Sequence, residues 1–122
     1  MSQVQKDEER ENRIDFEVVV DACEREERAM GWFYYLAERC EFPFKAKCIA
    51  ERSISPLLVD EEVEVISEAS AEECEKELFV KIQWKERQLA VPLSQLSVVE
   101  ADSTSRQIVE DWQYWIQQGY EY

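Results

Sequence analysis

The sequence predicts an α+β fold, in which a small antiparallel β-barrel of the Src-homology-3-like type lies between an N-terminal helical segment and a C-terminal helix. Two patterns indicate this order. Apolar residues recur at helical spacing over residues 14–41 and 103–118, whereas between residues 44 and 100 they alternate over short segments. A chain of 122 residues is typical of one domain, and its 45% hydrophobic content is enough for a core.

The N-terminal segment divides into a lead-in and a helical part. Residues 1–12 are polar and lack periodicity, so we expect a disordered acidic lead-in before a single domain over residues 13–122. The polar run EREER interrupts the helical pattern over 14–41, which leaves open one long helix or two helices that meet near Cys23. Gly31 indicates close packing or a kink. The apolar positions of the pattern are Ile14, Val18, Ala22, Ala29, Phe33, Leu36 and Cys40.

Short strands are predicted for the middle of the chain. Residues 44–50 alternate between two faces, and Val63 and Val65 alternate with glutamates. Residues 78–84 alternate likewise and lead through a tight link to a return strand, and a last brief strand at 97–100 follows the turn PLSQL. Five short antiparallel strands with tight links favour a small barrel over residues 44–100.

The C-terminal helix has signals at both ends. Asp102, Ser103 or Thr104 can cap its first turn, and Gly119 suits the position after its last turn. Its apolar face consists of Ile108, Trp112, Trp115 and Ile116. We therefore expect a helix over residues 103–118 that packs on the sheet.

The formal net charge of -14, from 28 acidic and 14 basic residues, excludes several classes of function. A nucleic-acid binder needs clustered Lys and Arg, and so acidic a protein is repelled by phosphate. The chain has no histidine, which rules out Ser-His and Cys-His hydrolases. Catalysis by paired carboxylates needs a deep cleft, for which so small a chain has little room. We therefore predict that the protein is not an enzyme.

The cysteines and the apolar runs indicate a cytoplasmic protein. The four cysteines form no CxxC pair, so reduced thiols are favoured over a zinc site. The N-terminus MSQVQKDEER resembles no signal peptide, which disfavours a secreted disulfide framework. No apolar run is long enough to span a bilayer, so no membrane association is expected.

The acidic residues are concentrated in one stretch. Residues 60–77 hold nine acids and one lysine, a net charge of -8. Close carboxylates repel one another, and Ca²⁺, which takes oxygen ligands, relieves that repulsion. Neither glycine has acids at the spacing of an EF-hand loop. If residues 61–68 form a strand, its ends are too far apart for one ion, so two cation regions are expected.

The candidate calcium ligands fall in three groups. One lies at each end of the acidic stretch, and a third is an i, i+3 pair at the end of the first helical segment. The candidates are Glu38, Glu41, Asp60, Glu61, Glu62, Glu72, Glu73 and Glu75. Ordering flexible glutamates costs entropy, so the expected affinity is on the order of micromolar or weaker.

Three stretches carry a family resemblance. The runs GWFYYLAERCEFPFKAKCIAERSISPL, EEVEVI and LFVKIQWKERQLAVPLSQL resemble the cyanobacterial family of calcium-binding proteins typified by CcbP, over residues 14–118. The resemblance implies a small acidic protein that binds calcium without EF-hands and buffers or sequesters intracellular Ca²⁺ through clustered surface carboxylates.

A second interpretation is an acidic interaction module or nucleic-acid mimic that binds a basic protein partner. Aromatic side chains at residues 32–35 and 112–115, with Tyr120 and Tyr122, supply contact surface for such a partner. Core packing competes with this interpretation, because helical spacing assigns Phe33 and Trp112 to the interior. A regulatory protein partner thus stays open beside the calcium ions.

Overall fold

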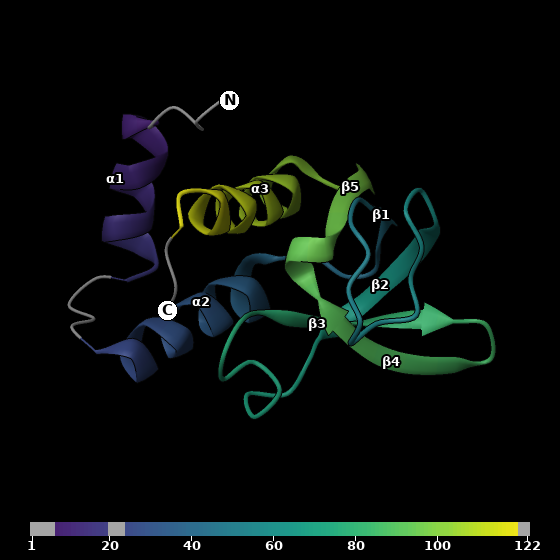
Figure 1. Cartoon of the computed structure of the whole chain (residues 1–122). Helices are drawn as coiled ribbons and strands as arrows, with labels where there is room; N and C mark the ends of the chain where they lie inside the picture. Colours follow the sequence, from purple (N-terminus) through teal and green to yellow (C-terminus); the bar gives the residue numbers. More distant parts are fainter. Residues whose placement is uncertain (1–6, 20–23, 120–122) are drawn as a thin grey trace.

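The α+β fold is confirmed by the computed structural model, which describes residues 7–19 and 24–119. These residues form three α-helices, five strands and one 3-10 helix, which follow one another along the sequence (Figure 1). They are α1 (Glu8–Glu17), α2 (Arg25–Arg39), β1 (Phe44–Cys48), β2 (Glu62–Glu68), β3 (Phe79–Trp84), β4 (Arg87–Pro92), η1 (Leu93–Gln95), β5 (Leu96–Glu100) and α3 (Ser103–Gln117).

All five strands belong to one antiparallel sheet of order β4-β3-β2-β1-β5. Phe44 pairs with Val65 and Ala46 with Val63, so the apolar positions of β1 and β2 share the buried face. Among the described residues no ladder joins β4 to β5, because η1 turns the chain between them. The sheet is therefore open, and the predicted Src-homology-3-like barrel is not confirmed.

The helical segment predicted over residues 14–41 consists of two helices, α1 and α2. Helix α1 begins at Glu8, where the Asp7 carboxylate accepts the Arg10 N–H at 3.0 Å. Residues 8–12, expected to be disordered, are thus helical, while residues 1–6 and Cys23 lie outside the described residues. The EREER run left open one long helix or two helices, and the structure contains two helices.

Gly31 is a point of close packing between α1 and α2. A Cβ atom built on Gly31 would lie 2.2 Å from the carbonyl oxygen of Val18, which caps the C-terminus of α1. Real Cβ atoms do not approach backbone atoms so closely. The glycine therefore lets the end of α1 contact the middle of α2, as the close-packing interpretation of the sequence requires.

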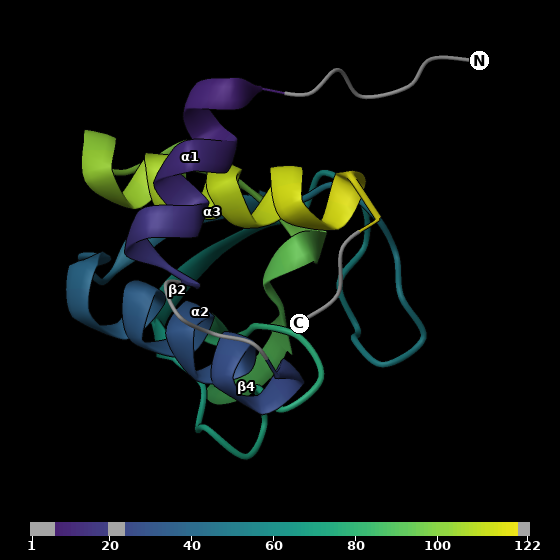
Figure 2. The same cartoon turned by 90° about the vertical axis from the view of Figure 1, so that its left-hand side faces the viewer.

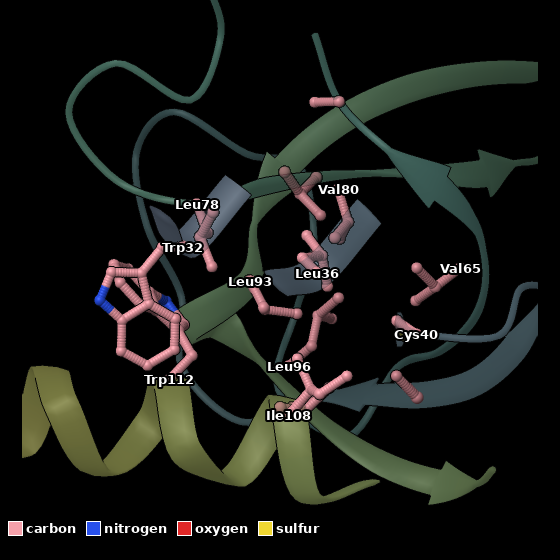
Figure 3. Packing of buried hydrophobic residues seen from close by; sticks show 14 of the residues in the cluster. Trp32, Leu36, Cys40, Val65, Leu78, Val80, Leu93, Leu96, Ile108 and Trp112 are labelled. Carbon is pink, nitrogen blue, oxygen red and sulfur yellow. The ribbon is translucent and has the colours of Figure 1, made fainter. Parts of the chain in front are cut away.

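The core lies between the sheet and the helices α2 and α3 (Figure 3). Trp32 of α2 and Trp112 of α3 are buried, and their rings meet edge to face with centroids 5.0 Å apart. Leu36 and Ile108 extend this contact toward the strands. Trp112 is buried as predicted, whereas Phe33 is only half-buried and Trp32 takes the interior position.

Helix α3 agrees with its sequence signals. The Asp102 carboxylate accepts the N–H groups of Thr104 and Ser105, both at 3.1 Å. At the other end, Gly119 has φ +84, the left-handed conformation that favours glycine. Helix α1 crosses the outer side of α3 and thus forms the outermost layer (Figure 2).

Candidate metal site

The first predicted group of ligands lies at the corner between β1 and β2. Asp60 has φ +73 and is exposed, and its carboxylate lies 4.0 Å from Lys47 Nζ. The Glu61 carboxylate accepts the Leu58 N–H at 2.9 Å. Glu62 is exposed and pairs with Lys47 across the ladder. The structure brings these three acids together, but a lysine and a backbone amide already compete for them.

The second group lies in the loop between β2 and β3. The Glu73 carboxylate accepts the backbone N–H of Ser70 at 3.1 Å and its hydroxyl at 3.0 Å, and the Glu73 N–H donates back to Ser70 Oγ. Near the end of the loop, Glu77 holds Arg52 through two hydrogen bonds of 2.8 and 2.9 Å. These two carboxylates are therefore engaged in holding the loop in shape.

Glu72 and Glu75 differ from Glu73 and Glu77 in that their carboxylates are not engaged by other groups that the structure describes. Both are exposed, and their carboxylates make no hydrogen bond or ion pair within the described residues. Between them Cys74 is buried, with 2% of its surface exposed, and it anchors the loop to the core. The loop is therefore anchored at Cys74, while the Glu72 and Glu75 carboxylates are exposed and form no ion pair among the described residues.

The third group lies where α2 ends. Glu38 and Glu41 are exposed, and the Glu41 N–H donates to Ser105 Oγ at 2.7 Å. Burial raises the pKa of the adjacent Cys40 thiol to about 11. Three carboxylates also raise that pKa by repelling the thiolate, and they belong to Asp102, Glu68 and Glu41.

Glu68 and Asp102 are therefore acidic neighbours that the sequence interpretation missed. Glu68 ends β2, and its carboxylate lies close enough to Cys40 to act on that thiol together with Glu41. Asp102 was predicted only as a cap of α3, and it does cap that helix. Both residues approach Cys40 only in the folded chain, so no local sequence pattern identifies them.

The three groups are separate regions of the surface. Strand β2 has seven residues, roughly 20 Å at the usual rise, and separates the first group from the second. Helix α2, with 15 residues and a length of roughly 20 Å, separates the second group from the third. Its N-terminal half faces the β2–β3 loop, whereas Glu38 lies at its C-terminal end. The two ends of the acidic stretch therefore lie too far apart to share one ion, and more than one cation region stays a prediction.

No preformed cage exists in the part of the chain that the structure describes. There, no three Asp, Glu or Cys side chains converge closely enough to hold a metal ion as they stand. All the candidate ligands except the half-buried Glu61 are exposed side chains. A hard cation would therefore have to draw glutamates together from their present positions, at a cost in side-chain entropy.

Comparison with known proteins decides the family. A family model that is named for CcbP and described as calcium binding matches residues 12–116. The chain belongs to the CcbP family. The resemblance inferred over residues 14–118 is thereby confirmed.

Two solved structures resemble the CcbP-family chain over its whole length. The crystal structure of Anabaena CcbP is 36% identical, covers 100% of both chains and has a TM-score of 0.87. A calcium binding protein in the calcium-binding form is 35% identical, also covers 100% of both chains and has a TM-score of 0.86. No curated protein matches the sequence. Over residues 7–19 and 24–119, no helix has the length and apolar character needed to cross a bilayer.

Proposed function

We propose that this chain binds Ca²⁺ through surface carboxylates, without an EF-hand, and that it buffers intracellular calcium. The observation that carries the proposal is the match to a calcium-binding family over residues 12–116. A structure of the calcium-binding form of a protein that is 35% identical over the full length supports the same ion. The family is not one of enzymes, and we infer no catalytic role.

The β2–β3 loop is the region we favour for the ion. Glu72 and Glu75 form no ion pair among the described residues, although Arg25 and Lys76 line the same groove, and Glu73 lies between them on the loop. Calcium prefers carboxylate and carbonyl oxygens and accepts irregular geometry, which an exposed loop can supply. Repulsion among these acids falls when a divalent cation binds.

The other two regions are weaker candidates for different reasons. At the β1–β2 corner, Lys47 lies near Asp60 and opposite Glu62, so part of the negative charge is already balanced. At the end of α2, Asp102 is committed to capping α3, which leaves Glu41, Glu38 and Glu68. We infer that these regions bind cations more weakly than the loop does.

Over residues 7–19 and 24–119 the acids form no preformed cage, and a buffering role is consistent with this. Drawing exposed glutamates together costs entropy, so we expect an affinity on the order of micromolar or weaker, which suits reversible exchange with a cellular pool. Several modest regions on one small protein also raise its capacity. We therefore interpret the excess acidity of the chain as its means of storing calcium.

Titration with Ca²⁺ and then Mg²⁺, followed by amide chemical shifts, tests where the ion binds. We expect saturable Ca²⁺ shifts in residues 70–77, smaller shifts in 60–64 and 38–41, and weak responses to Mg²⁺, which demands a stricter octahedral geometry. Uniform, non-saturating shifts along the chain would show only counterion attraction and would contradict the proposal. Saturable shifts confined to another surface would contradict the location while leaving calcium binding intact.

A further inference from the structure

A groove runs between the N-terminal half of α2 and the β2–β3 loop, with a volume of about 490 Å³. The loop lies beneath α2 in both views of the molecule (Figures 1 and 2). Ala29, Met30 and Phe33 line it from the helix, and Ala71 lines it from the loop. These side chains give the groove an apolar floor, and its volume is within the roughly 300–1,000 Å³ of ordinary ligand sites.

The floor belongs to a flank of α2 that the core does not use. Trp32 and Leu36 of α2 are fully buried against the sheet and α3, whereas Met30 is 40% exposed and Phe33 only half-buried. Residues 29, 30 and 33 lie on neighbouring positions of the helix surface, so they form one continuous strip. Methionine adapts to differently shaped partners and is frequent at surfaces that bind peptides.

The rim of the groove is acidic on balance. Three carboxylates line it, those of Glu26, Glu72 and Glu75, against the two cations Arg25 and Lys76. The loop is also part of the 60–77 stretch, whose net charge is -8, and the whole chain carries -14. A basic partner is therefore drawn toward this side of the molecule, and an acidic one is repelled.

We propose that the groove binds a segment of a partner protein in which aliphatic side chains are flanked by Lys or Arg. The aliphatic side chains occupy the floor over Met30 and Phe33, and the basic side chains pair with Glu72 and Glu75. Helix-in-groove recognition uses this combination of an apolar seat and charged borders. The inference goes beyond calcium binding, although it uses two of the same carboxylates.

The test uses a fluorescein-labelled amphipathic peptide made only of leucine and lysine, at physiological ionic strength with calcium chelated. Fluorescence anisotropy should show saturable binding by the full chain, and a matched leucine–glutamate peptide should not bind. Met30→Glu should weaken binding by about tenfold, roughly 1.4 kcal/mol, because the apolar seat is lost. Glu72→Gln with Glu75→Gln should also weaken it. Amide shifts caused by the peptide should fall in residues 25–33 and 71–76.

The Met30→Glu variant separates groove binding from general electrostatic attraction, because it adds negative charge to the protein. Equal or tighter binding by Met30→Glu would overturn the proposal, as would no binding by the unaltered chain. Glu8→Gln with Glu9→Gln removes the same charge from the exposed first turn of α1 and should leave the affinity unchanged. Since calcium is chelated throughout, failure of calcium binding does not affect the result.

Discussion

Asp111→Asn is expected to lower the free energy of unfolding by about 3 kcal/mol, because it removes the charged centre of a buried ion-pair network. Asp111 has no exposed surface, yet it lies on α3 in contact with Arg10 and Arg13 of the polar helix α1. Urea unfolding, followed by circular dichroism and tryptophan fluorescence, measures the loss. Amide hydrogen exchange should also become faster throughout α1, since the network joins that helix to α3.

The geometry of the network explains the size of the effect. Asp111 Oδ1 accepts from Arg13 Nη2 at 2.7 Å and from Arg10 Nη1 at 3.0 Å. Asp111 Oδ2 accepts from the Tyr35 hydroxyl at 2.8 Å and from Arg13 Nε at 3.1 Å. Burial, with the neighbouring carboxylate, raises the pKa of Tyr35 to about 12, so the phenol stays a donor at neutral pH. An amide would set its own N–H donors against these donors.

Glu110→Gln is the matched control for Asp111→Asn. Glu110 is the preceding residue on α3, and its exposed carboxylate lies 3.9 Å from Arg10 Nη2. Surface pairs of this kind contribute about 0–1 kcal/mol, so Glu110→Gln should change the unfolding free energy little. An equal effect of the two substitutions, or no effect of Asp111→Asn, would contradict the assignment of Asp111 as the anchor of α1.

Replacing Glu72 and Glu75 together by Gln is expected to weaken the strongest calcium site by about tenfold, a loss of roughly 1.4 kcal/mol. The substitution removes the charge of the two proposed ligands in the β2–β3 loop but keeps the size of both side chains. Neither carboxylate makes a hydrogen bond or ion pair among the described residues, so the fold should be unaffected. Calorimetric titration with calcium, alongside urea unfolding of the calcium-free variant, separates lost affinity from lost stability.

Two further variants locate the calcium site by comparison. Asp60→Asn with Glu62→Gln removes two charges at the β1–β2 corner, and asparagine tolerates the positive φ of residue 60. We expect a smaller loss of affinity there because Lys47 already balances part of that charge. Glu8→Gln with Glu9→Gln removes two charges from α1 and should have the smallest effect. A larger loss from the corner variant than from the loop variant would move the principal site to the corner.

Local sequence patterns were sufficient for most of the elements. Alternation of Phe44, Ala46 and Cys48 placed β1 and its buried face, and Asp102 with Gly119 bounded α3, since these signals act within a few residues. The docking of α1 could not be predicted in this way. It depends on contacts of Arg10 and Arg13 with Asp111, which is about a hundred residues further along the chain. The spacing of apolar residues carries no information about such a contact.

The candidate site could be predicted only in part, because it depends on contacts between residues that are distant in the sequence. The charge count located the acidic stretch, but which acids remain unneutralised depends on the pairing of Glu62 with Lys47 and on the contact of Glu77 with Arg52. Glu68 and Asp102 come near Glu41 only through folding. The aromatic residues show the same limit, because Trp32 and Tyr35 are buried whereas Tyr34 is 49% exposed, and Tyr120 and Tyr122 lie outside the described residues.

Isothermal titration of the unaltered chain with CaCl₂ at physiological ionic strength tests the central claim most directly. We expect a saturable, calcium-dependent heat with a dissociation constant on the order of micromolar or weaker, and little heat from the same concentrations of MgCl₂. Added salt at this level already screens diffuse attraction between exposed charges. The absence of any saturable calcium heat would contradict the proposal that this acidic chain binds and buffers calcium.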